Sequence, residues 1–167
     1  GIGRIGQEVA KIAFGLGMNV KAADAFIENV EIKLDFPNNQ SVSIPVKTEP
    51  LDNVLNESDF VTLHVPAQKG GALLGKEEFA KMKDGVAVVN CARGGVIDEV
   101  ALIEALNSGK VAFAGLDVFV NEPTPSSEIL SHPKISLTPH IGAATEEAQE
   151  RIGTELAAQI TSIFQNA

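Results

Sequence analysis

Four short apolar runs alternate with segments of helical periodicity along most of this chain of 167 residues. The apolar runs lie at 60–65, 86–91, 112–118 and 135–138, and the helical patterns lie at 50–57, 76–82, 98–107 and 146–165. Strands that alternate with helices are joined by right-handed crossovers and form a parallel sheet. The alternation therefore predicts an α/β fold with a doubly wound parallel sheet, in a single domain over residues 1–167.

The first 24 residues have the pattern of a nucleotide-binding turn. Gly1, Gly3 and Gly6 open a predicted helix, and a predicted strand over 18–23 follows it and ends at Asp24. Such glycines let the backbone approach a pyrophosphate at the helix N-terminus, and the acidic residue binds the ribose hydroxyls. The triplet is weak evidence alone, and Asp24 alone could be a turn residue, but together they support cofactor binding. No Arg follows Asp24 to hold a 2′-phosphate, so the pattern favours NAD over NADP.

Two features depart from an uninterrupted α/β pattern. Alternating apolar residues over 30–36 and 42–46 flank a turn, which predicts an inserted β-hairpin at about 30–47. In addition, a glycine turn of this kind is expected to follow the central strand of the sheet. The sequence starts at Gly1, the first residue of the turn, so the residues of that strand are not in it. We therefore expect a fragment of a longer protein, without the first strand and without a substrate domain.

Three polar residues follow three of the predicted strands. Arg93 comes after the 86–91 run, Glu122 after the 112–118 run and His140 after the 135–138 run. The carboxyl ends of parallel strands meet at one edge of the sheet, where open α/β sheets bind ligands. A guanidinium holds a carboxylate through two hydrogen bonds, imidazole titrates near neutral pH, and a carboxylate partner fixes the tautomer of the imidazole. Together the three residues predict a site that removes a proton and a hydride from a 2-hydroxy acid.

Each of these residues also has a simpler interpretation. Arg93 could be a surface residue paired with Asp98 or Glu99, and Glu122 could be a solvated loop acid. A histidine such as His140, taken alone, is more often structural than catalytic. The occurrence of all three after neighbouring strands favours the catalytic interpretation.

Further residues near the predicted strand ends are candidate cofactor contacts. His64 is expected to line the cofactor cleft, and Asp117 lies in an apolar run, so it requires a partner and could bind the nicotinamide carboxamide. Cys91, the single cysteine, is expected to be a buried and unreactive thiol. No cluster of His, Cys, Asp or Glu has the spacing of metal ligands, so no metal site is predicted.

Charge and cysteine content exclude several classes of function. The net charge of −9 and the pI near 4.8 would repel nucleic acid and anionic membranes. A single cysteine forms no internal disulfide, which fits the reducing cytoplasm. No apolar stretch of the sequence is long enough to span a bilayer. We therefore expect a cytoplasmic protein that acts on a small molecule.

Four motifs resemble the signatures of the D-isomer-specific 2-hydroxyacid dehydrogenases. They are GIGRIG at 1–6, NCARGGVIDE at 90–99, GLDVFVNEP at 115–123 and TPHIGAAT at 138–145. The resemblance implies a Rossmann-like domain of an oxidoreductase that transfers a hydride between NAD and a D-2-hydroxy acid, and it implies a homodimer or higher homo-oligomer. Members of the family that act as NAD-sensing corepressors share the fold, so a binding protein stays an alternative.

The resemblance also implies roles for individual residues. Arg93 would bind the substrate carboxylate, His140 would be the acid/base, and Glu122 would orient His140. The residues that would line the NAD site are Gly1, Gly3, Arg4, Ile5, Gly6, Asp24, His64, Val65, Pro66, Cys91, Ala92, Arg93, Asp117, His140, Gly142 and Ala143.

Overall fold

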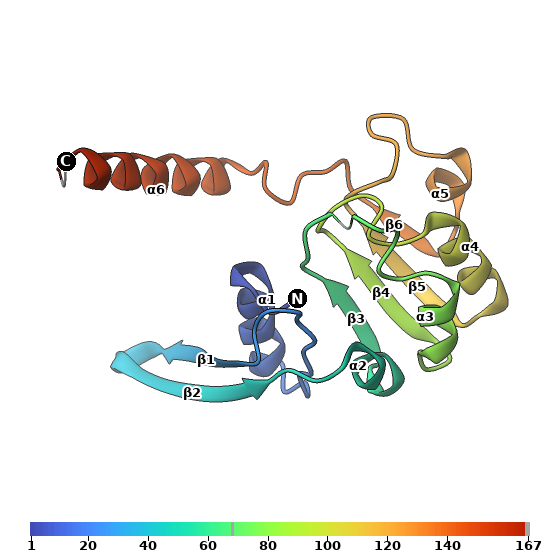
Figure 1. Cartoon of the computed structure of the whole chain (residues 1–167), viewed down its shortest axis with the longest axis horizontal. Helices are drawn as coiled ribbons and strands as arrows, with labels where there is room; N and C mark the ends of the chain where they lie inside the picture. The colour runs from blue at the N-terminus through green and yellow to red at the C-terminus, as the bar shows by residue number, and fades with distance from the viewer. Residues whose placement is uncertain (68, 166–167) are drawn as a thin grey trace.

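The fold combines a parallel sheet with a separate antiparallel hairpin (Figure 1). The computed structural model describes residues 1–67 and 69–165. In chain order the elements are α1 (Arg4–Gly15), β1 (Asn29–Phe36), a 3₁₀ turn (Pro37–Asn39), β2 (Gln40–Lys47), α2 (Leu51–Glu57), β3 (Phe60–Leu63), α3 (Lys76–Lys81), β4 (Val86–Asn90), α4 (Glu99–Ser108), β5 (Val111–Leu116), α5 (Ser127–Ser131), β6 (Ile135–Leu137) and α6 (Glu146–Gln165). The parallel sheet has the order β3-β4-β5-β6, which confirms the predicted α/β class. The predicted domain end at 167 lies outside the described residues.

The parallel sheet buries one of its two faces. Alternate residues of β4, Val86 and Val88, are fully buried in a core that also takes residues from α2, α3, α4 and α5. The opposite face carries Phe60 and Phe113, each 65% exposed, because successive side chains of a strand point to opposite faces. Since all four strands run in the same direction, their C-terminal ends share one edge.

A second, smaller core joins α1 to the hairpin. Its buried residues are Ile2, Ala10, Ala22, Ile32 and Val46. The hairpin predicted at about 30–47 is present, with β1 and β2 paired antiparallel. Figure 1 shows the far end of the hairpin extending away from the parallel sheet. The hairpin is therefore anchored through its base on α1.

The strand predicted over 18–23 is wrong. Ala22 alone forms a β-bridge, with Thr48, and the carbonyl of Ala22 accepts the N–H of Glu49 at 2.8 Å. On its other side, the amino group of Gly1 donates to the carbonyl of Ala23 at 2.9 Å. Two such short neighbours supply too few partners for a ladder, so the segment is extended without forming a strand.

Two further elements differ from or extend the sequence predictions. The sequence did not predict helix α5, because the surrounding serines and prolines are typical of loops. The hydroxyl of Ser126 caps the N-terminus of α5 by accepting the N–H of Ile129 at 3.3 Å. The final helix was predicted, and the hydroxyl of Thr145 caps it by accepting the N–H of Ala148 at 3.2 Å. The described part of α6 has no buried residue, and its large apolar side chains are exposed: Ile152, Leu156, Ile160, Ile163 and Phe164. Figure 1 shows α6 running away from the parallel sheet.

No helix in the described ranges has both the length and the apolar character that a membrane crossing requires.

Candidate active site

The turn formed by Gly1, Gly3 and Gly6, called the glycine turn below, lies beside the C-terminal end of β3. A Cβ on Gly1 would come within 2.5 Å of the backbone oxygen of His64, and a Cβ on Gly6 within 2.2 Å of the backbone oxygen of Gly1. Both positions therefore require glycine. Gly3 precedes α1 with open space around its α-carbon, and no described side chain caps the helix there. The free N–H groups of the first helical turn can receive a pyrophosphate.

Asp24 fixes the glycine turn to the segment that follows α1. Its Oδ2 accepts the N–H of Ile2 at 2.8 Å, and its Oδ1 accepts those of Phe26 and Ile27 at 2.9 and 3.1 Å. Burial alone would raise the pKa of Asp24, but the hydrogen bonds from Phe26, Ile2 and Ile27 hold that pKa below its usual value. Asp24 is thus an ionised turn residue whose Oδ2 keeps a lone pair for a ribose hydroxyl.

Arg93 is presented by a loop that the side chain of Asn90 shapes. Asn90 is only 2% exposed; its Oδ1 accepts the N–H of Ala92 at 3.0 Å and its Nδ2 donates to the carbonyl of Arg93 at 3.0 Å. The Nη1 of Arg93 donates to the carbonyl of Ala92 at 2.6 Å. Within the described residues Arg93 forms no ion pair with Asp98 or Glu99, because Asp98 caps α4 and Glu99 accepts a backbone N–H of the loop after β5.

His140 and Glu122 form a hydrogen-bonded pair. The Nδ1 of His140 lies 2.6 Å from the Oε2 of Glu122, whose Oε1 accepts the N–H of Phe119 at 2.9 Å. These bonds from His140 and Phe119 lower the pKa of Glu122. An ionised carboxylate only accepts hydrogen bonds, so Nδ1 carries the hydrogen and Nε2 is the nitrogen available for proton exchange. The imidazole side chain is 47% exposed, so a small molecule can reach it.

The buried carboxylate of Asp117 holds the turn that carries His140. Its Oδ1 accepts the hydroxyl of Thr138 at 2.5 Å and the N–H of Ile141 at 2.9 Å, and its Oδ2 accepts the N–H of Gly142 at 2.8 Å. Burial alone would raise the pKa of Asp117, but these bonds and the neighbouring His140 lower it. The partner that the sequence required for Asp117 is therefore this turn.

The predicted burial of Cys91 is wrong. The side chain of Cys91 is exposed, because the preceding Asn90 takes the inward position at the end of β4. Partial desolvation and the charge of Asp117 raise the pKa of Cys91, so the thiol stays protonated. His64 is half-buried, and its Nε2 lies 3.1 Å from the hydroxyl oxygen of Thr62. Burial is the main factor that lowers the pKa of His64.

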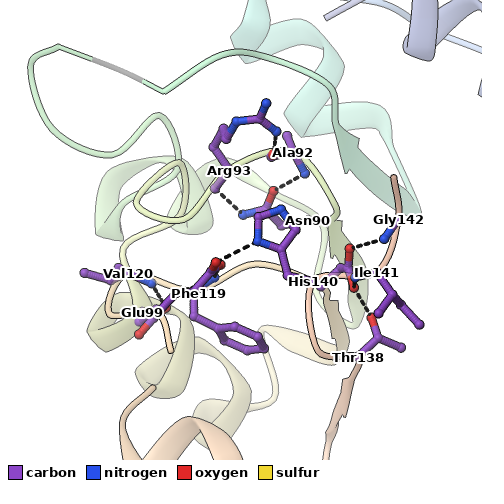
Figure 2. A network of polar contacts seen from close by, with 12 residues as sticks. Asn90, Ala92, Arg93, Glu99, Phe119, Val120, Thr138, His140, Ile141 and Gly142 are labelled. Carbon is purple, nitrogen blue, oxygen red and sulfur yellow. Dashed lines mark hydrogen bonds and ion pairs between the residues drawn. The ribbon is translucent and has the colours of Figure 1, made fainter. Parts of the chain in front are cut away.

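The predicted residues form a row along one edge of the parallel sheet. The glycine turn lies at the end of β3, Arg93 follows β4, Glu122 follows β5 and His140 follows β6. Figure 2 shows the loops of Arg93, Asn90 and His140 meeting at this edge. The structure thus brings His140 and Glu122 into contact, and it places Arg93 on the same edge without a hydrogen bond to either.

An open pocket of about 450 Å³ adjoins the His140–Glu122 pair. Its other lining residues are mostly apolar: Phe119, Pro123, Pro125, Leu130, Leu137, Thr138 and Pro139. The described residues contain no group of three His, Cys, Asp or Glu side chains that could hold a metal ion.

Sequence reasoning missed the residues that support this site. Asn90 and Thr138 are ordinary polar residues at strand ends, and only their position before Arg93 and His140 could have indicated a supporting role. Gly94 also supports the site, because a Cβ there would lie 1.8 Å from the carbonyl oxygen of Phe119. This glycine therefore lets the Arg93 loop pack on the Glu122 loop.

Comparisons with known proteins show the family to which the chain is similar. Residues 1–142 match the family profile described as D-isomer specific 2-hydroxyacid dehydrogenase, NAD binding domain. Hydroxypyruvate reductase of Thermotoga maritima is 48% identical over 96% of this chain and 50% of its own length. D-3-phosphoglycerate dehydrogenase of Archaeoglobus fulgidus is 45% identical over 98% of this chain and 30% of its own length.

A solved structure gives the same result at the level of the fold. The crystal structure of D-lactate dehydrogenase from Aquifex aeolicus, complexed with NAD and lactic acid, matches with a TM-score of 0.74 and 30% identity, over 99% of this chain and 52% of that one. The chain thus spans about half or less of the length of these relatives. From the profile match and these similarities, the chain belongs to the D-isomer-specific 2-hydroxyacid dehydrogenases and has the fold of their NAD-binding domain.

Proposed function

We propose that this chain supplies the NAD site and the acid/base of an enzyme that transfers a hydride between NAD and a D-2-hydroxy acid. The observation that carries the proposal is the 2.6 Å hydrogen bond between His140 and Glu122 at the ligand-binding edge of the sheet. The glycine turn, Asp24, His64 to Pro66, the 91–93 loop and the 140–143 turn would line the cofactor site.

Each of the three residues Arg93, Glu122 and His140 would carry out one part of the reaction. NAD, when bound, would supply the acceptor for the hydride that leaves C2 of the hydroxy acid. The Nε2 of His140 takes the hydroxyl proton, and Glu122 stabilises the resulting imidazolium through Nδ1. The guanidinium of Arg93 holds the substrate carboxylate and polarises the developing carbonyl. In the reverse reaction His140 returns the proton to the carbonyl oxygen.

We propose D-3-phosphoglycerate, oxidised to 3-phosphohydroxypyruvate in serine biosynthesis, as the substrate pair. Support comes from the 138–153 segment, which resembles that of D-3-phosphoglycerate dehydrogenase, and from the similarity to the Archaeoglobus enzyme of that name. A glyoxylate or hydroxypyruvate reductase, or a D-lactate-type dehydrogenase, is the second candidate. The 48% identity to the Thermotoga hydroxypyruvate reductase favours this second candidate, in particular a hydroxypyruvate reductase.

Replacement of His140 tests the acid/base assignment. In the full-length gene product, His140→Gln removes the titrating nitrogen and should lower kcat by roughly 10²–10⁴-fold, while the dissociation constant for NADH stays unchanged. His132→Gln is the matched control, because His132 lies at the end of α5 with hydrogen bonds to Asn107 and Lys134. A normal rate for the His140 variant, or loss of NADH binding, would contradict the assignment.

The substrate is tested by comparing reduction rates of 3-phosphohydroxypyruvate, hydroxypyruvate, glyoxylate and pyruvate by NADH. A higher kcat/KM for the phosphorylated substrate supports phosphoglycerate, and the reverse order supports the second candidate. Negligible turnover with all four, together with tight NADH binding, would instead favour an NAD-sensing corepressor-like protein.

We also propose that the protein acts in the cytoplasm as a homodimer or higher homo-oligomer. The single cysteine fits a reducing compartment, and self-association follows from the family resemblance. Light scattering after size exclusion measures the mass in solution, and a monomer would contradict self-association.

A further inference from the structure

His140 has a backbone conformation that side chains other than glycine seldom adopt. Its φ is 55°, in the left-handed region. Outside glycine this region is disfavoured and persists where surrounding contacts enforce it. The turn must therefore contain contacts that hold His140 in place.

The contacts that enforce the turn come from one carboxylate. Asp117 is 3% exposed and accepts hydrogen bonds from Thr138, two residues before His140, and from Ile141 and Gly142, directly after it. The carboxylate thus fixes the chain on both sides of the imidazole. The Oε2 of Glu122 then lies 2.6 Å from Nδ1.

Gly142 fits this arrangement for a steric reason. A Cβ at this position would lie 3.0 Å from the Oδ2 of Asp117, which is tighter than ordinary van der Waals contact. A side chain there would require the Oδ2 of Asp117 to shift by a few tenths of an ångström. The close approach of Gly142 and the hydroxyl of Thr138 therefore belong to the same support.

We propose that Asp117, together with Thr138, is a positioning residue that holds His140 in the left-handed turn and aims its Nδ1 at Glu122. This role differs from the nicotinamide contact expected from the sequence, because it acts through the protein backbone and does not require the cofactor. It rests on the proposed function only in so far as the position of His140 affects catalysis.

The test removes the Thr138 hydroxyl and reads out both the ring and the reaction. Thr138→Val keeps the shape of the side chain and deletes the bond to Asp117, and Thr138→Ser restores the hydroxyl. Thr48→Val is the matched control, since the hydroxyl of Thr48 donates to the carbonyl of Ile27, outside the row of site residues. All variants are made in the full-length gene product.

The direct readout is the imidazole proton of His140. A hydrogen in a 2.6 Å N–H···O bond gives a strongly deshielded NMR signal. The signal is assigned to His140 by its loss in His140→Gln. We expect the signal to shift or broaden in Thr138→Val and to return in Thr138→Ser.

The kinetic readout separates positioning from cofactor binding. Displacing the acid/base by up to about 1 Å should lower kcat by about 10–10²-fold in Thr138→Val, while the dissociation constant for NADH stays within twofold of wild type. Thr138→Ser and Thr48→Val should have wild-type kcat. Gly142→Ala should shift or broaden the His140 signal as Thr138→Val does, which gives a second probe of the ring position if the latter folds poorly; its affinity for NADH is not a readout, because Gly142 lies in the turn proposed to line the cofactor site.

Each outcome has a distinct meaning. An unshifted His140 signal in both Thr138→Val and Gly142→Ala would overturn the positioning role. A weaker affinity for NADH with an unshifted signal would overturn it in favour of a cofactor contact. If His140→Gln has a normal rate, the acid/base proposal fails, but the NMR signal still decides whether Asp117 and Thr138 position the ring.

Discussion

Gly94 links the loop of Arg93 to the loop of Glu122, and its replacement by alanine should damage both stability and activity. A Cβ on Gly94 would lie 1.8 Å from the oxygen and 2.4 Å from the carbon of the Phe119 carbonyl. Both atoms belong to the backbone, so no side-chain rotation relieves the contact. The two loops must separate for the variant to fold.

The required movement sets the size of the effect. To pass from 1.8 Å to beyond 3.0 Å, the loops must move apart by more than about 1 Å. Overpacking on this scale costs about 3 kcal/mol, which lowers Tm by about 6–12 °C in a domain of this size. Arg93 moves with its loop, and a displacement of this size should reduce kcat/KM by up to about 10²-fold.

The neighbouring glycine is the control. Gly95 has a φ of 76° and no described atom within 4 Å of a built Cβ, so Gly95→Ala meets backbone strain without a collision. Its expected cost is about 1–2 kcal/mol, with little change in kcat/KM. Thermal unfolding and steady-state kinetics of the two variants measure the difference. If Gly94→Ala melts no lower than Gly95→Ala and has wild-type activity, the packing argument is refuted.

Three further predictions concern the charged groups of the site. Arg93→Ala should raise KM for the 2-oxo acid more than it lowers kcat, because the proposed contact with the substrate carboxylate would already form in the ground state; unchanged kinetics with every 2-oxo acid tried would exclude this role. Asp24→Ser should weaken NADH binding by about 10–10²-fold, which is the size expected for the loss of a hydrogen bond to a charged group. Fluorescence titration measures the dissociation constant, and an unchanged value would exclude a ribose contact. The folded-state pKa of Asp117 is depressed, so its contribution to stability is present above the ordinary aspartate value of about 3.9 and is lost as pH falls through the folded-state value. Urea midpoints should therefore differ more between wild type and Asp117→Asn at pH 7 than at pH 3, and an equal difference at both pH values would contradict the ionised state of Asp117.

Local pattern was enough to predict most elements of the fold. The apolar runs at 86–91 and 112–118 correspond to the parallel strands β4 and β5, which end one and two residues earlier than predicted, and the hairpin is present where alternation indicated it. These features depend on neighbours within a few residues or on the period of the side chains. The row of site residues followed from the same reasoning, since parallel strands share one edge.

The details that the sequence did not predict depend on residues distant along the chain. Whether Ala22 joins a strand depends on the neighbours at Thr48 and Gly1, and the exposure of Cys91 depends on which residue of the strand end points inward. A short serine-capped helix such as α5 is also too brief to give a periodic signal.

The sequence by itself determined the fold class and the edge at which Arg93, Glu122 and His140 must gather, because alternation of strands and helices leaves one direction for all four strand ends. The tertiary structure alone decided the contacts at that edge. Glu122 and His140 are 18 residues apart in the chain, and Asp117 and Thr138 are 21 apart, yet each pair meets at hydrogen-bonding distance. Distances of this kind arise from how neighbouring loops pack, and residue periodicity carries no information about that packing.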